Sequence, residues 1–148
     1  MFLCEIKIKG KIHLVLLGED GNIKDERTVE NMIVNTGRAH IIDRLQAGAV
    51  AAADYIAIGT NNTAVTAADT TLNTENARGQ GTLSQPDAYT DRSVFTFTAG
   101  VGTGTIVEAG RLNASSNGTL MGRQTFTGIV KGAADSLQVT YDFTYAAS

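Results

Sequence analysis

Few side chains in this chain of 148 residues have the type and spacing that chemistry requires. The two histidines, His13 and His40, stand far apart, and neither belongs to a His-x-x-x-His or Cys-x-x-Cys pattern that supplies metal ligands. The single cysteine, Cys4, has no partner for an internal disulfide and is best explained as a small apolar residue. We therefore expect no metal, no cofactor and no catalytic nucleophile.

Two other patterns are equally weak as catalytic signals. Asp87 and Asp91 flank Tyr89 in a polar segment, and glycosidases need two carboxylates at a set separation. Two acids four residues apart on a loop fit a solvated or calcium-like role better, with no ligand assigned. The segment 102–104, Gly-Thr-Gly, lacks the further glycine and the helix of a dinucleotide-binding loop, and is typical of a hairpin turn. The sequence thus predicts a protein that is not an enzyme.

The strand that begins the chain carries a basic face. In CEIKIKGKIHLVLL, Lys7, Lys9 and Lys11 alternate with apolar residues, and Gly10 indicates a bulge or a turn. The lysines have three interpretations: a solvated edge protected against aggregation, a docking face for an acidic protein surface, or a nucleic-acid contact. Few aromatic residues accompany them, and the formal net charge of -3 gives no general attraction to nucleic acid or anionic membranes.

Residues 1–34 differ in composition from the rest and form the first of two predicted units. The turn GEDGN at 18–22 joins the first strand to a second over 23–34, because Asp-Gly favours a tight hairpin. This unit is either a hairpin on the main domain or an arm that reaches a neighbouring subunit. An arm would be removable through residue 12 without loss of the fold.

One short helix is predicted near residues 36–47. Asn35 and Thr36 are suitable N-terminal caps, and Gly48 is suited to end the helix in a left-handed conformation. The apolar face at spacing three consists of Ala39, Ile42 and Leu45. This face is expected to pack against the sheet.

The remaining segments predict an all-β fold. Residues 55–58 read as a short buried strand, and 59–92 as an unusually long polar loop. From residue 94 onward, apolar and polar residues alternate in short runs separated by Gly, Asn and Ser. The predicted domain, 35–148, is therefore a sandwich or a jelly-roll-like barrel. No apolar run is long enough to span a bilayer, and the first residues do not form a convincing signal peptide, so we expect synthesis and retention in the cytoplasm.

Three segments carry a resemblance to a known family. They are NMIVNTGRAHIIDRLQAG, then YIAIGTNNTAVTAADTTLNTENAR, then GTIVEAGRLNASSNGTLMGRQTFTGIVKGAADSLQVTYDFTY. Together they span roughly residues 31–145 and resemble a recurrent family of tailed-bacteriophage virion structural proteins. Capsid decoration (cement) proteins and tail-fibre or tail-tip proteins both carry similar sequences. The chain departs from the family pattern at 111–113, Arg-Leu-Asn, where we expect only a changed surface contact.

The resemblance implies a capsid decoration protein that binds the outside of the assembled shell and stabilises it. The implied partners are the major capsid protein and other copies of the chain, as a homodimer or homotrimer on a symmetry axis. The expected contact surfaces are Lys7, Lys9 and Lys11 and the loop from Thr60 to Asp91. The alternative is a tail-tip, collar or tail-fibre module. A carbohydrate-active enzyme or lectin is disfavoured, since the chain has no Trp and only 6% aromatic residues.

Four charged residues are candidates for fixing the long loop. Glu75 and Arg78 are three residues apart, and either has the reach to pair with Arg123 or Glu108 across the fold. A buried, hydrogen-bonded pair would hold the loop against the sheet. The alternative is a set of separate exposed charges that contribute little.

Overall fold

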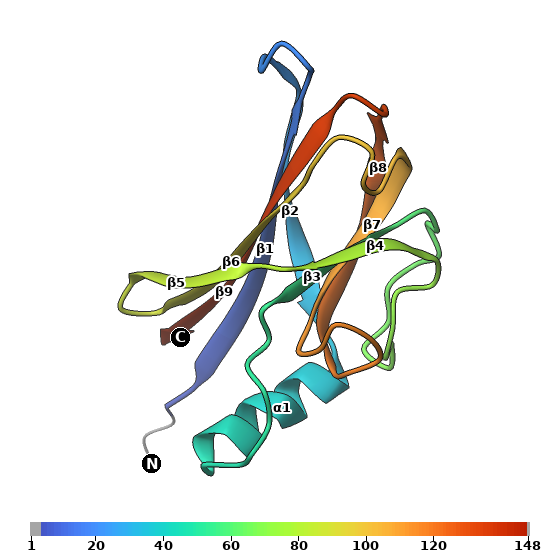
Figure 1. Cartoon of the computed structure of the whole chain (residues 1–148). Coiled ribbons are helices and arrows are strands. Elements are labelled where there is room, and N and C mark those ends of the chain that lie inside the picture. Colours follow the sequence, from blue (N-terminus) through green and yellow to red (C-terminus); the bar gives the residue numbers. More distant parts are fainter. Residues whose placement is uncertain (1–3, 148) are drawn as a thin grey trace.

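The alternating sequence pattern folds into a single antiparallel sheet that curls into a nearly closed barrel (Figure 1). A computed structural model describes residues 4–147, which form nine strands and one helix. The elements are β1 (Ile6–Leu17), β2 (Ile23–Ile33), α1 (Asn35–Leu45), β3 (Tyr55–Gly59), β4 (Glu75–Gln80), β5 (Thr82–Asp87), β6 (Thr90–Phe97), β7 (Gly104–Leu112), β8 (Leu120–Lys131) and β9 (Ser136–Ala147). The all-β prediction with one short helix is confirmed.

The two edges of the sheet are consecutive in the sequence. The strand order is β4-β3-β7-β8-β2-β1-β9-β6-β5, so the edge strands β4 and β5 are separated only by Gly81. The carbonyl oxygen of Asp54 accepts hydrogen bonds from the Gly81 N–H and the Ser93 hydroxyl, each at 2.8 Å. A side chain at Gly81 would approach Ser93 Oγ to 2.3 Å, so glycine is required where the chain crosses from one edge to the other.

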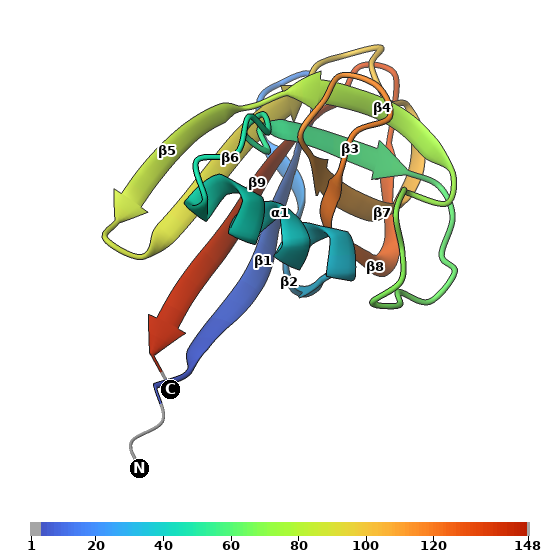
Figure 2. The ribbon, with the colours of Figure 1, turned by 90° about the horizontal axis from the view of Figure 1, so that it is seen from below.

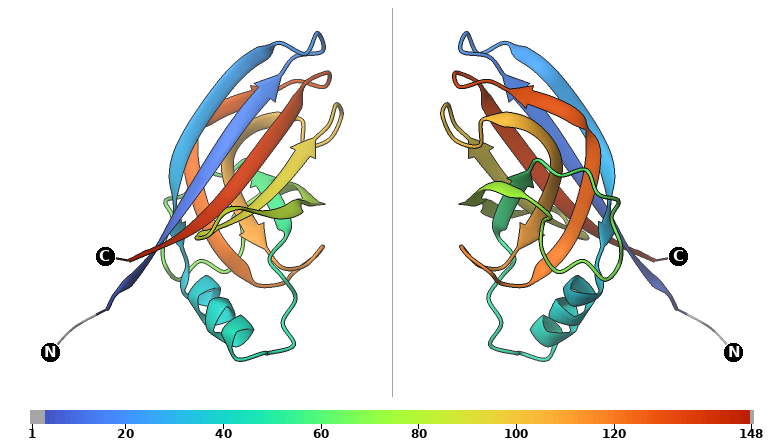
Figure 3. Two further views of the ribbon diagram at one scale, coloured as in Figure 1. Left: turned by 90° about the vertical axis from the view of Figure 1, so that its left-hand side faces the viewer. Right: turned by 90° about the vertical axis from the view of Figure 1, so that its right-hand side faces the viewer.

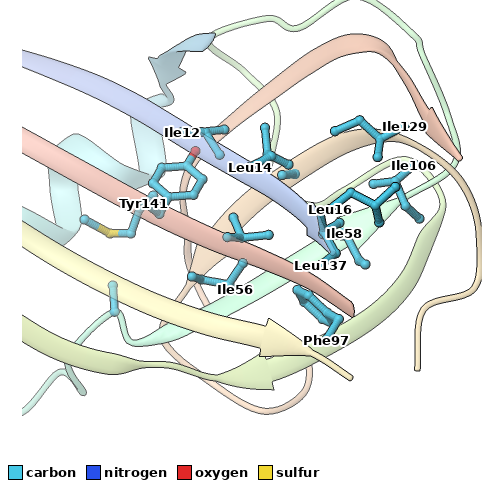
Figure 4. Packing of buried hydrophobic residues seen from close by; sticks show 14 of the residues in the cluster. Ile12, Leu14, Leu16, Ile56, Ile58, Phe97, Ile106, Ile129, Leu137 and Tyr141 are labelled. Carbon is cyan, nitrogen blue, oxygen red and sulfur yellow. The ribbon is translucent and has the colours of Figure 1, made fainter. Parts of the chain in front are cut away.

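The interior is filled by the inward residues of strands on opposite walls (Figure 4). On β1, Ile12 and Leu14 are fully buried, and they belong to one cluster with Ile56 of β3 and with Tyr141 of the adjacent strand β9. The other labelled members are Leu16, Ile58, Phe97, Ile106, Ile129 and Leu137. Burial of each such large aliphatic side chain stabilises the fold by about 1.5–3 kcal/mol, so this cluster is the main source of stability.

β1 lies in the middle of the sheet, paired with β2 on one side and β9 on the other. Removing residues 1–12 would delete half of this strand together with the buried Ile12, so that segment is not a removable arm. The expected bulge or turn at Gly10 is also wrong, since the register passes through Gly10 without interruption. Glycine stands there because an added Cβ would collide with the side chain of Asn31, which fills that part of the barrel.

The helix differs from its prediction in its caps and in its buried face. Val34 is the N-cap residue, and Thr36 instead donates its hydroxyl to the Leu120 carbonyl, 2.7 Å away. At the other end Ala47, not Gly48, has a positive φ of 56°. The buried residues are Gly37 and His40, because the helix backbone approaches β8 so closely that only glycine fits against Met121. The predicted face of Ala39, Ile42 and Leu45 is exposed.

Two predicted loops are wrong. Nearly half of the predicted loop 59–92 is strand, since β4, β5 and the start of β6 fall within it, and the long irregular part is confined to 60–74. The alternation of apolar and polar residues does not reveal β4 and β5, because these strands are mostly polar. They are held by backbone pairing to β3 and β6. Residues 102–104 do not form a hairpin, because β6 and β7 are not paired, and the segment links strands from different parts of the sheet.

Substituting Gly37 by alanine tests the close approach of α1 to β8. The new Cβ would lie 2.1 Å from the Met121 carbonyl oxygen, so the helix must move outward. We expect the free energy of unfolding to fall by about 1–3 kcal/mol, as for other overpacked sites. The measurement is urea unfolding, and Ala39→Leu on the exposed side of the same helix is the control, with a change within about 0.5 kcal/mol. Equal stabilities for the two variants would contradict the packing described.

Candidate interaction surface

The loop at 60–74 is fixed by a buried cluster of charges. Arg123 and Glu108 are both fully buried and form an ion pair of 2.7 Å. The Arg123 guanidinium also donates to Asp69, at 2.9 Å, and to the carbonyl oxygen of Thr63, at 3.0 Å. Glu108 accepts the backbone N–H groups of residues 73 and 74, at 3.1 and 2.8 Å. The two side chains therefore hold both ends of the loop against β7 and β8.

The other two predicted charges pair with each other. Glu75 and Arg78 form an ion pair of 2.6 Å along β4, rather than reaching Glu108 or Arg123 across the fold. Arg78 also donates to the carbonyl oxygens of Ala114 and Asn117, at 2.8 and 3.0 Å. This pair therefore fixes the turn between β7 and β8, and the long loop depends on the other pair. Spacing alone did not distinguish these pairings, because β4 and β8 are not neighbours in the sheet.

Replacing each arginine by methionine separates the two roles. Arg123→Met leaves Glu108 buried without its cation, which costs about 3–5 kcal/mol, and exposes the amides of 60–74 to exchange. Arg78→Met has the matched side-chain change, and its faster exchange is expected at 113–119 instead. Hydrogen–deuterium exchange with mass spectrometry resolves the two segments. Equal protection of 60–74 in both variants would mean that the loop is held by other contacts.

The three candidate lysines share the outer face of β1. Lys7, Lys9 and Lys11 are exposed, and their neighbours Ile6, Ile8 and Ile12 point the other way. Lys11 lies opposite Asp142 of β9 and Glu30 of β2 in the pairing register. Lys9 lies opposite Thr144 and Lys7 opposite Ala146. The positive charge nearest the start of β1 thus has no acidic cross-strand neighbour.

A groove opens at one end of the barrel, between α1 and the inner face of the sheet. In Figure 2, β1 and β9 run past the helix as a two-stranded ribbon, and the β5–β6 hairpin projects beside them. Figure 3 shows the helix lying across this end of the barrel. The groove has a volume of about 720 Å³ and mainly apolar walls. Its exposed large apolar side chains, with their exposed fractions, are Ile6 (70%), Ile42 (53%), Leu45 (77%) and Leu83 (42%).

Arg111 forms part of the groove wall and is the residue that the sequence prediction missed. Its side chain is 1% exposed, and its guanidinium donates to the carbonyl oxygens of Ala53, Asp91 and Tyr141. It also pairs with the Asp91 carboxylate, at 2.9 and 3.0 Å, and lies over the ring of Phe143. The expected surface contact at 111–113 is therefore wrong for its first two residues, which are buried. The alternation in the sequence gave no signal for it, because a register shift between Ile106 and Glu108 reverses the inward and outward positions along β7.

His40 also lines the groove, and its side chain is nearly buried at 4% exposure. Burial lowers the pKa of His40, and the nearby Arg44 and Arg111 lower it further, while Asp43 opposes them. The imidazole is therefore neutral at pH 7. Arg44 stands at the rim, where its guanidinium donates to the carbonyl oxygen of Val50 at 3.0 Å.

The remaining candidate residues have structural partners or lie apart. His13 bonds to Glu26 across the β1–β2 hairpin, at 2.8 Å. Asp87 accepts hydrogen bonds from the Tyr89 N–H and the Thr90 hydroxyl in the β5–β6 turn, whereas Asp91 is the partner of Arg111. Cys4 is exposed.

Within residues 4–147, no three His, Cys, Asp or Glu side chains gather into a group that would hold a metal ion. The described helix is neither long enough nor apolar enough to cross a membrane.

The neutral His40 predicts a pH dependence of stability. Below about pH 6.5 the unfolded chain binds a proton at this position more readily than the folded chain, so stability falls as the pH is lowered. We expect wild type to lose more unfolding free energy than His40→Gln between about pH 7 and pH 5.5, by at most about 1.4 kcal/mol per pH unit. Chemical denaturation at each pH measures the two losses. Carboxylates titrate in wild type and in the variant alike. Equal losses of unfolding free energy would therefore show that folding does not change the pKa of His40.

Comparisons with protein-family models, with curated proteins and with solved structures found no match to this chain.

Proposed function

We propose that this chain is a structural protein of a tailed-bacteriophage virion that decorates the capsid exterior and stabilises the assembled shell. The uncovered apolar groove at the end of the barrel carries this proposal. A contiguous exposed apolar patch rimmed by polar residues is typical of a protein-binding surface. The sequence resemblance over residues 31–145 supports the proposal that the protein with this surface is a virion protein.

The fixed loops support a mechanical role. Arg123 and Arg111 each join separate segments through several hydrogen bonds from one buried guanidinium. A scaffold whose loops are held in this way presents its binding surface with little conformational entropy to lose on association. Many copies bound only to the assembled shell would stabilise that shell by their binding free energy.

The basic face of β1 supplies a second contact in this proposal. Lys7 and Lys9 lie on the opposite face of the same ribbon whose Ile6 and Ile8 line the groove. The ribbon would meet an acidic surface of the major capsid protein through its outer face. Self-association as a dimer or trimer places several such ribbons around one symmetry axis.

The test is the copy number per particle, counted by quantitative mass spectrometry against the major capsid protein. Decoration predicts a count comparable with that protein. It also predicts that Lys7→Ala/Lys9→Ala weakens attachment to purified shells by about threefold or more. This difference between the variant and wild type should decrease as the salt concentration is raised. A few copies per particle would instead assign the chain to the tail tip, the collar or a tail fibre.

Lys24→Ala is the matched control for the lysine variant. Lys24 is the second residue of β2, at the far end of the β1–β2 hairpin from Lys7 and Lys9, and pairs with Asp135 at 2.9 Å. The Lys24→Ala substitution removes a positive charge that lies outside the proposed contact face. Equal attachment of the lysine double variant and wild type would remove β1 from the contact surface.

A further inference from the structure

The groove has a polar composition that specifies the chemistry of its occupant. Arg111 is neutralised there by Asp91, and the lowered pKa leaves His40 uncharged. Arg44 donates to a backbone carbonyl group, and within the described residues it has no carboxylate within ion-pair distance. The apolar walls therefore carry one uncompensated positive charge at the rim. An occupant that complements them has apolar side chains and a carboxylate.

The free edge of β5 lies beside this groove. Within residues 4–147, β5 pairs only with β6, so its other edge has unpaired backbone groups. All six residues of β5 are exposed. Pro86 has no N–H and Asp87 is charged, but the four residues 82–85 are uncharged and contain no proline, so these four form the open part of the edge. Such an edge accepts an additional strand through main-chain hydrogen bonds.

The edge and the groove are joined through Leu83. Leu83 belongs to β5 and lines the groove, so the inner face of β5 is continuous with the groove wall. Side chains on the same face of adjacent strands are neighbours, and every second residue of an added strand would point toward the groove. One extended segment can thus form hydrogen bonds with the unpaired backbone groups of β5 and also place apolar side chains in the groove.

We propose that the groove and the β5 edge bind an extended peptide segment of another protein, with apolar residues at alternate positions and a carboxylate that reaches Arg44. This inference rests on the proposed function for the identity of the partner, a neighbouring virion protein. The segment adds a strand to β5, and its apolar side chains cover Leu83, Ile42 and Leu45. Its carboxylate forms the ion pair that Arg44 lacks.

Selection from a ribosome-displayed library of short random peptides on the intact chain tests the proposal. We expect enriched peptides that alternate apolar residues and contain Asp or Glu. A synthetic representative, followed by fluorescence anisotropy, should bind Leu83→Glu and Arg44→Ala at least about tenfold more weakly than wild type. Val130→Glu is the matched control, because Val130 is an exposed apolar residue of β8 outside the groove. Its affinity should equal that of wild type.

N-methylation of the peptide tests the strand pairing. Methyl groups on alternate amides remove the donors of one peptide edge, so one of the two methylated registers should lose binding and the other should retain it. Retention by both registers would overturn the added strand. Selection of no peptide, or equal binding to Leu83→Glu, would overturn the proposal.

Two further outcomes separate this inference from the proposed function. A stable dimer in sedimentation that Leu45→Glu converts to monomer would mean that a second copy fills the groove, which overturns the peptide proposal alone. Full attachment of Leu83→Glu to capsids would do the same. Absence of the chain from purified particles would remove the virion function, whereas selective peptide binding would still stand.

Discussion

The guanidinium of Arg111 is the contact on which this end of the barrel depends. It extends from β7 and reaches β6, β9 and the segment before β3, so it joins opposite walls of the barrel. Its three nitrogens make five hydrogen bonds, which offset much of the cost of burying a cation. The walls are thereby held in register at this end of the barrel, where the guanidinium lies over the ring of Phe143 at the margin of the apolar cluster. A buried cation therefore spans the barrel beside the groove.

Buried polar contacts and glycines therefore determine details that apolar packing leaves open. The aliphatic cluster of Figure 4 stabilises the barrel, but it does not specify where the loops lie. Arg123 and Glu108 place the loop 60–74, and the absence of a side chain at Gly37 sets the distance of α1 from β8. The helix consequently buries its small residue and turns Ile42 and Leu45 outward. An arrangement that leaves apolar helix residues uncovered is expected where another molecule completes the packing.

The sequence predicts the parts of this fold in which periodicity and burial agree. The alternation in β1 and in the last three strands correctly gave strands, and the Asp-Gly pair correctly gave the first hairpin. β4 and β5 were missed because their residues are mostly polar, and β4 also pairs with a strand on the far side of the loop 60–74. The helix was found, but its buried face was not, because a period-based argument assigns burial to large apolar residues and gives no weight to Gly37. Of the groove, the sequence indicated Ile42 and Leu45 as an apolar face, whereas Arg111, Asp91 and Leu83 converge only through the closed topology.

The pairing of β1 with β9 has a consequence for biosynthesis. These strands lie at opposite ends of the described chain, yet they are paired over their whole lengths in the centre of the sheet. On the ribosome, β1 and its buried Ile12 and Leu14 must wait for β9 to be translated before the barrel can form. Closing so large a loop is entropically costly, and native topologies dominated by distant contacts fold slowly. The nascent chain thus exposes its future interior throughout translation, and it is in this interval, rather than in the finished barrel, that chaperones have most to protect.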